Sequence, residues 1–167
     1  MILLLVLLAT TAAAAGLLTA RGRPSLRLAA CWGMAVAMGF AGLSHLLMPA
    51  PFVQHLPPWV PVREELVLAT GVLEIVLGAA LLRRQPGRRR AGVLLAAYLV
   101  LVFPANVYVA VADVEVDGMP GASSWFRLPL QLLFVAWTLW STRDVGPAVG
   151  NDGRATTSPS RRSDVAA

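Results

Sequence analysis

Five polar side chains interrupt otherwise apolar stretches of this sequence, and their chemical types are suited to binding a ligand or moving a proton. They are His45, Glu74, Asn106, Arg127 and Gln131. Imidazole and carboxyl groups donate and accept protons, amides orient a bound group through hydrogen bonds, and a guanidinium group sets the local field. An ionisable group at membrane depth is energetically expensive, which makes it a functional candidate. The five residues therefore predict a polar site inside an apolar protein, without assigning a catalytic role to any of them.

The elements that position these side chains are expected to be apolar helices. The chain has 57% hydrophobic and 14% charged residues and a mean hydropathy of +0.67, which is too apolar for a soluble domain of 167 residues. A spanning helix needs about 20 mainly apolar residues, or about 17 at the short end, and the stretches that qualify are 1–20, 28–48, 66–82, 91–112 and 125–141. We expect an all-α membrane protein with a four-helix transmembrane bundle and an additional N-terminal transmembrane helix.

The five polar residues fall at similar depths in these stretches. With a rise of about 1.5 Å per residue, each lies within roughly 3 to 12 Å of the same boundary, so four helices would meet in one polar layer. Glu74 shares a helix face with small residues that allow close approach of a neighbouring backbone, namely Thr70, Gly71 and Gly78. In the last stretch, Arg127 and Gln131 share a face with Phe134 and Thr138.

Glu74 requires either a proton or a cationic partner, because a bare carboxylate is unfavourable in hydrocarbon. By depth, Arg127 is the first choice of partner and His45 is the second. His55 lies in the proline-rich connector 49–61, which we expect to be a stiff loop without regular helix, and its side chain is expected to face solvent. Two interpretations of the layer stay open: a structural pair that fixes how the helices assemble, and a site that binds or transforms a ligand.

The distribution of arginine predicts the orientation. The chain has no Lys, and 12 of its 14 Arg residues fall in the connectors 21–27 and 83–90 and in the segment after residue 142. Arginine-rich connectors are typical of the cytoplasmic side, so the polar layer would lie near the outer surface, with the N-terminus outside and the C-terminus inside. The use of Arg without Lys, together with abundant Ala, Val, Leu and Gly, is typical of a GC-rich bacterial genome, which indicates a bacterial plasma membrane.

The two ends of the chain are expected to differ from the central part. Residues 1–20 are interpreted as a retained transmembrane helix rather than a signal peptide, because they lack a basic first region and cleavage would leave arginines at an exported terminus. Residues 142–167 are rich in Gly, Pro and Ser, and we expect a disordered cytoplasmic tail. The predicted divisions are therefore 1–20, 27–141 and 142–167.

Several other functions are disfavoured. The net charge of +5 comes from connector arginines, which predicts topology rather than nucleic-acid binding. Cys31 is the only cysteine, so no intramolecular disulfide can form. One His and one Glu on separate helices are too few for a metal site, because zinc usually takes three or four protein ligands.

Four motifs follow one another in a characteristic order: GLSHLLMPAPFVQHLPPWVP, TGVLEIVLGAALL, FPANVYVA and WFRLPLQLLFVAW, with an arginine-rich loop after the second. Together they resemble the DoxX family of small membrane proteins, over residues 27 to 140. The resemblance implies a four-helix membrane bundle for residues 27–141 and an association with membrane redox complexes, since the family takes its name from a subunit associated with an archaeal terminal quinol oxidase. The N-terminal span departs from that pattern, and the lack of a cysteine pair argues against thiol redox chemistry.

These observations lead to three functional hypotheses. The first is an integral membrane accessory or binding protein whose outer polar pocket holds a quinone, a lipid or another lipophilic small molecule. Its surroundings would be the lipid bilayer, and its partner would be a membrane redox complex or an oxidoreductase subunit. Glu74 and His45 would supply hydrogen bonds or protons, Asn106 and Gln131 would orient the ligand, and Arg127 would set the field. The second is a scaffold that stabilises a membrane partner without a ligand. The third is a membrane-embedded enzyme of proton transfer, although an accessory role is favoured over a stand-alone enzyme.

Overall fold

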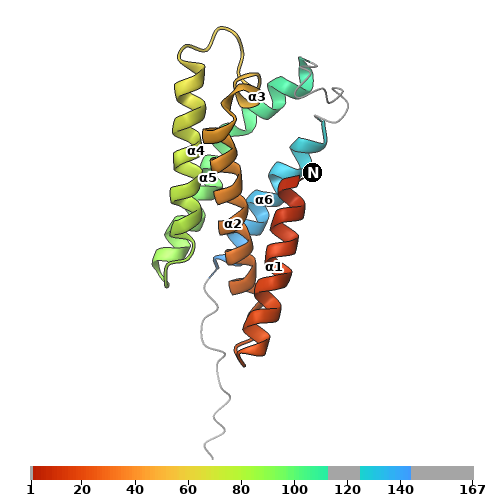
Figure 1. The fold of residues 1–167 in the computed structure, drawn as a ribbon, viewed down its shortest axis with the longest axis vertical. Helices are drawn as coiled ribbons and strands as arrows, with labels where there is room; N and C mark the ends of the chain where they lie inside the picture. The colour runs from red at the N-terminus through yellow and green to blue at the C-terminus, as the bar shows by residue number, and fades with distance from the viewer. Residues whose placement is uncertain (1, 113–124, 144–167) are drawn as a thin grey trace, which may run out of the picture.

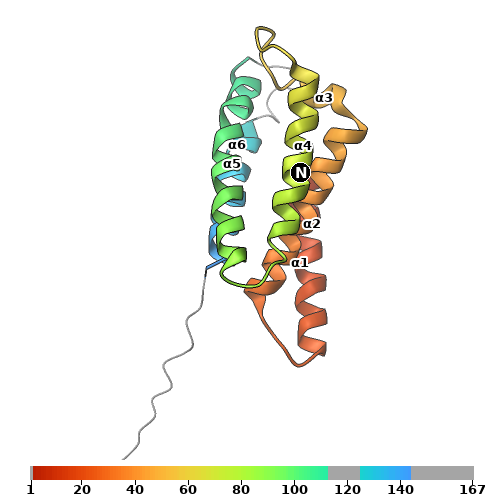
Figure 2. The same ribbon diagram turned by 90° about the vertical axis from the view of Figure 1, so that its left-hand side faces the viewer.

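The described part of the chain is helical. The computed structural model describes residues 2–112 and 125–143, and no strand occurs among them. The helices are α1 (Ile2–Ala20), α2 (Leu26–Leu47), α3 (Pro49–Val53), α4 (Arg63–Ala80), α5 (Gly87–Val111) and α6 (Arg127–Ser141). The long helices run roughly side by side, and the short α3 lies near one end of them (Figures 1 and 2). The expected all-α class is confirmed for these residues, whereas most of the expected tail lies outside them.

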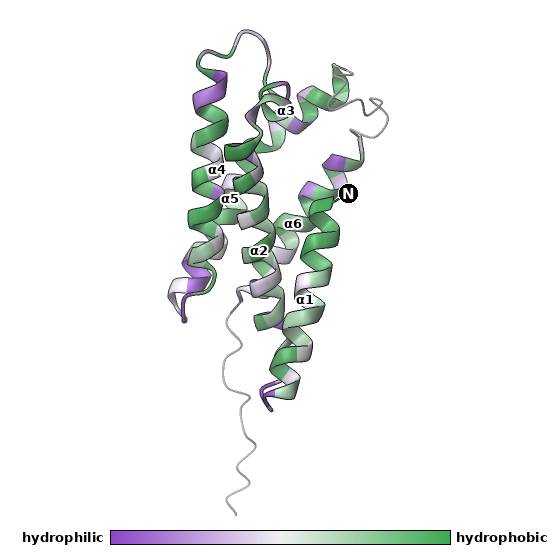
Figure 3. Ribbon diagram, viewed as in Figure 1, coloured by the Kyte–Doolittle hydropathy of each residue, from purple (hydrophilic) through white to green (hydrophobic). Residues whose placement is uncertain are grey.

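Three of the helices, α1, α2 and α5, are long and apolar enough to cross a membrane. The expected spans at 66–82 and 125–141 also form helices, but α4 includes four charged residues and α6 has only 15 residues, so neither meets the same standard. Figure 3 shows apolar residues along the lengths of the helices and hydrophilic residues mainly at their ends. Many large apolar side chains are exposed on the outside, including Leu101 at 77% and Val100 at 58%. The chain is therefore a helical protein with the surface of a membrane protein.

Helix α2 lies at the centre of the packing, between α1 and α4 (Figure 1). Helices α5 and α6 pack against each other. They join α1, α2 and α4 through contacts of α5 with α4 and of α6 with α2. The core is formed where these helices meet, and its fully buried side chains include Leu7, Met34, Met38, Leu81 and Leu95. Because α1 contributes Leu7 to this core, the N-terminal helix is packed into the fold rather than lying apart from it.

Glycines allow α2 and α4 to approach closely. A Cβ atom placed on Gly71 would lie 2.7 Å from Cβ of His45 and 2.8 Å from the carbonyl oxygen of Gly42. Further along the pair, a Cβ atom on Gly78 would lie 2.9 Å from Cβ of Met38. Both α4 glycines are buried with Glu74, so the predicted small-residue face of α4 is confirmed. This face packs against α2. This approach brings the end of α2 that carries His45 beside Glu74.

The connector between α2 and α4 differs from the expected loop. Its first residues form the single-turn helix α3, which begins directly at Pro49. Proline is well tolerated in the first turn of a helix, where its missing N–H has no intrahelical partner, so the proline density did not exclude a helix there. The backbone then returns to α4 through Val62, which adopts a left-handed conformation with φ of 47°.

Candidate functional site

Glu74 is the central residue of the candidate site, because its two carboxyl oxygens are in different situations. The side chain is buried, and Oε1 accepts a hydrogen bond of 2.8 Å from the hydroxyl of Tyr98 on α5. Oε2 is also buried and has no hydrogen-bond partner, and it lies 3.8 Å from Nδ1 of His45 on α2. Three helices thus converge on one carboxyl group that has a single unsatisfied oxygen.

His45 is held in place from two sides. Its Nδ1 lies 3.5 Å from the hydroxyl oxygen of Thr70, which donates its own proton to the carbonyl of Val67 at 2.8 Å. The hydroxyl oxygen of Thr70 can therefore accept from Nδ1 when that nitrogen carries a proton. The ring of Phe52 meets the imidazole edge-on, with ring centroids 4.0 Å apart. The orientation of His45 toward Glu74 is fixed by neighbours on α3 and α4.

The contacts restrict where a proton can reside in this pair. Oε1 of Glu74 accepts from Tyr98, so a protonated carboxyl group would carry its proton on Oε2, the oxygen that faces His45. A deprotonated carboxyl group would instead need the proton on the imidazole. Both arrangements have no net charge, which is what an apolar interior tolerates best. The pair can therefore exchange a proton with a third polar group, or hydrogen-bond to it, at Oε2.

Asn106 and Gln131 form a second set of contacts, between α5 and α6. Nδ2 of Asn106 donates to Oε1 of Gln131 at 2.9 Å, and Nε2 of Gln131 donates to the carbonyl of Leu99 at 2.7 Å. Two of the five residues of the predicted layer are therefore in direct contact. Pro104 lies inside α5 and has no N–H to donate to the carbonyl of Val100. The side-chain amide of Gln131 donates to the carbonyl of Leu99, one residue earlier in the helix.

Arg127 does not have the partner that its depth suggested. Its guanidinium group contacts Nε2 of His55 in the connector, and the polar contacts of Glu74 among the described residues are with Tyr98 and His45. Nδ1 of His55 lies 2.9 Å from the carbonyl of Pro51 and must donate to it, so Nε2 is the acceptor for Arg127. His55 is therefore half-buried and engaged, rather than facing solvent. The long Arg127 side chain starts at the first residue of α6 and reaches outward, away from the depth of Glu74.

Tyr98 and Phe52 are the site residues that sequence reasoning missed. Depth along a helix describes the position of a Cα atom, whereas the long ring of Tyr98 carries its hydroxyl to a carboxyl group on another helix. The available signal was a hydroxyl group in the otherwise apolar stretch 91–103. Phe52 stacks on His55 at 5.9 Å while it meets His45, so it joins the two histidines.

Two surface pockets of the structure lie at the other end of the bundle, and neither is lined by a residue of the layer. Over residues 2–112 and 125–143, no group of three or more His, Cys, Asp and Glu side chains is arranged to hold a metal ion. The polar groups gathered around Glu74 are the hydroxyl of Tyr98 and the imidazole of His45.

Comparison with protein-family models matches residues 34–142 to a family described as "Domain of unknown function (DUF8561)". The chain belongs to this family. The matched segment contains all five residues of the predicted layer, together with the newly found Tyr98. Searches of curated proteins and of solved structures found no match.

Proposed function

We propose that the chain is an integral membrane protein of the DoxX type, with a four-helix transmembrane domain over residues 27–141 and an additional N-terminal transmembrane helix. The motif order in the sequence supports this, as does the packing of α4 and α6 alongside α2 and α5. The concentration of arginine at one end supports a bacterial plasma membrane with the N-terminus outside and the C-terminus inside.

Within this frame, we propose that the chain is an accessory protein that binds a quinone or a similar lipophilic small molecule at Glu74 and His45, within a membrane redox complex. The observation that carries the proposal is the buried Oε2 of Glu74, which lacks a hydrogen-bond partner and faces His45. Buried polar atoms without partners are rare, because each one costs about 1 to 3 kcal/mol. A quinone carbonyl or quinol hydroxyl would complete the hydrogen bonding of the pair.

Binding of a decyl-substituted ubiquinone analogue to the purified full-length protein tests this function. Glu74→Gln keeps the shape of the side chain and removes the exchangeable carboxyl proton, so it should abolish saturable binding. Glu65→Gln, at an exposed position in the first turn of the same helix, should bind like the unaltered protein. Mass spectrometry of small molecules that survive gentle purification gives an independent reading. Equal binding by both variants would remove Glu74 from the site.

A second candidate function is that of a scaffold for a membrane partner, in which the layer only locks the helices together. The bonds from Asn106 to Gln131 and from Gln131 to the Leu99 carbonyl favour it, because they join α5 to α6 and are internally satisfied. In that case Glu74→Gln should lower the melting temperature and the recovery of a co-purifying membrane protein, while no quinone is found in either form. Loss of quinone with an unchanged melting temperature would instead exclude a purely structural role.

A further inference from the structure

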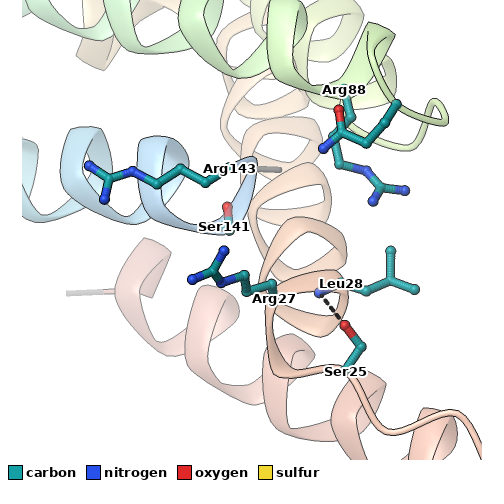
Figure 4. Close-up of a pocket in the computed structure, with 7 residues that line it drawn as sticks. Ser25, Arg27, Leu28, Arg88, Ser141 and Arg143 are labelled. Atoms are coloured by element: carbon teal, nitrogen blue, oxygen red, sulfur yellow. Dashed lines mark hydrogen bonds between the residues drawn. The ribbon is translucent and has the colours of Figure 1, made fainter. Parts of the chain in front are cut away.

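A second polar cluster lies at the opposite end of the bundle. There, the first turn of α2, the start of α5 and the end of α6 surround a pocket of about 180 Å³ (Figure 4). Its lining residues are Ser25, Arg27, Leu28, Gln85, Arg88, Ser141 and Arg143. Three of these are arginines, and among the described residues that line it none is acidic, so this part of the chain presents positive charge there.

Hydrogen bonds between separate elements hold the walls of this pocket. Nε2 of Gln85 donates to the carbonyl of Thr142 at 3.2 Å, which ties the start of α5 to the end of α6. The thiol of Cys31 donates to the carbonyl of Ser141 at 3.2 Å, which ties α2 to the same turn. The arginines therefore project from a fixed frame.

The Arg88 side chain retains donors for a ligand. Arg88 uses Nε to donate to the carbonyl of Leu81 at 3.2 Å, and its terminal nitrogens extend beyond that bond. Guanidinium groups match the geometry of phosphate oxygens better than ammonium groups do, and they bind phosphate in pairs of hydrogen bonds. The N-terminal end of α2 adds backbone N–H groups and a partial positive charge at the same place.

An apolar groove adjoins the basic pocket. It has a volume of about 400 Å³ and is lined by Leu26, Ala136, Trp137 and Trp140. No residue lines both depressions, and the edge between them is marked by Arg27 of the pocket and Trp140 of the groove. At that edge the guanidinium of Arg27 lies 5.9 Å from the ring centroid of Trp140. A ligand with an anionic head and an apolar chain fits this juxtaposition.

We propose that this end of the protein binds an anionic phospholipid, with the phosphate in the arginine pocket and one acyl chain along the apolar groove. The charge of the pocket selects an anionic headgroup over a zwitterionic one, because it offers no carboxylate for a choline or ethanolamine cation. The adjoining groove selects a lipid over free phosphate. The site is separate from Glu74 and does not depend on the function proposed there.

Native mass spectrometry of the full-length protein in detergent, titrated with phosphatidylglycerol, phosphatidylcholine or inorganic phosphate, tests the proposal. We expect discrete binding of phosphatidylglycerol at concentrations where phosphatidylcholine with the same acyl chains does not bind. Inorganic phosphate should compete only weakly. Equal binding of the two lipids, or binding of inorganic phosphate as tight as that of the lipid, would overturn it. This comparison uses the unaltered protein and requires no variant.

Two double variants with the same change in charge locate the site. Arg27→Gln with Arg88→Gln removes two pocket arginines and should weaken phosphatidylglycerol binding about 30-fold. Arg89→Gln with Arg90→Gln removes two exposed arginines from the same end and should weaken it less than about threefold. Circular dichroism checks that both retain their helices. Equal losses of binding in the two variants would show that the lipid is attracted to the charged end as a whole. That result would overturn the proposal that the pocket is the binding site.

Discussion

Glu74 and Gln131 are both buried polar residues, but their surroundings satisfy them to different degrees. Gln131 uses its carbonyl to accept from Asn106 and its amide to donate to a backbone carbonyl, so both ends of the side chain are engaged. Glu74 has one engaged oxygen and one without a hydrogen-bond partner. A satisfied group contributes to assembly, whereas an unsatisfied one leaves a bond for another molecule. At the scale of the residue, the layer therefore contains both a fully hydrogen-bonded pair and a carboxyl group with one unpartnered oxygen.

Replacing Gln131 by Leu tests the structural part. The substitution leaves the amide of Asn106 and the carbonyl of Leu99 without their side-chain partner, which should lower the free energy of unfolding by about 1 to 3 kcal/mol. Adding Asn106→Leu removes one of the stranded groups, so the double variant should be less destabilised than the sum of the two single variants. Unfolding in detergent, followed by circular dichroism, measures all three. Strict additivity would contradict the coupling, and Gln54→Leu, at an exposed connector position, serves as the control.

The residues that sequence reasoning could and could not place differ in the length of their side chains. Short amides act close to the depth of their own backbone, so Asn106 and Gln131, which the sequence places at similar depths, do meet. Arg127 and Tyr98 reach far from their Cα atoms, and depth then says little about their contacts. Arg127 was therefore wrongly paired with Glu74, and the bond from Tyr98 was missed.

At the scale of the element, the packing of α2 against α4 is what places His45 beside Glu74. The spacing of glycines along α4 predicted which face would be buried, because helical periodicity is a local property of the sequence. The partner helix was not predictable from that pattern, since it depends on which other helix also presents a small residue at the matching height. Gly42 of α2 provides it, through contact with the backbone of Gly71.

Gly42→Ala should separate α2 from α4, and Gly39→Ala on the same helix should not. A Cβ atom on Gly42 would collide with the carbonyl oxygen of Gly71 and lie 2.8 Å from Cγ1 of Ile75, whereas one on Gly39 would meet nothing within 4 Å. Overpacking of this kind costs about 1 to 3 kcal/mol, while alanine in an open helical position stabilises by up to about 1 kcal/mol. Thermal unfolding of the two variants compares them directly. Equal melting temperatures would show that the close approach of α2 and α4 is not required.

At the scale of the whole molecule, composition predicted a helical membrane protein, and the structure agrees at that level. It could not predict how much each helix contributes to crossing the bilayer, because Glu74 of α4 and Gln131 of α6 are buried against other helices. The two ends of the bundle also differ in chemistry. One end carries the polar layer and the acidic first turn of α4, and the other carries the arginine pocket beside an apolar groove.

This asymmetry predicts the orientation of the protein in the membrane, which single-cysteine labelling can measure. In a Cys31→Ser background, Trp59→Cys places a thiol in the connector before α4, at a position that is 81% exposed, and Arg84→Cys places one in the exposed loop before α5. Because arginine-rich connectors remain on the cytoplasmic side, a membrane-impermeant maleimide should label Trp59→Cys in intact cells and Arg84→Cys only after permeabilisation. The opposite pattern would invert the topology and place Glu74 near the cytoplasmic surface. Quinone exchange at Glu74 would then face the inner leaflet, and the arginine pocket would meet lipids of the outer one.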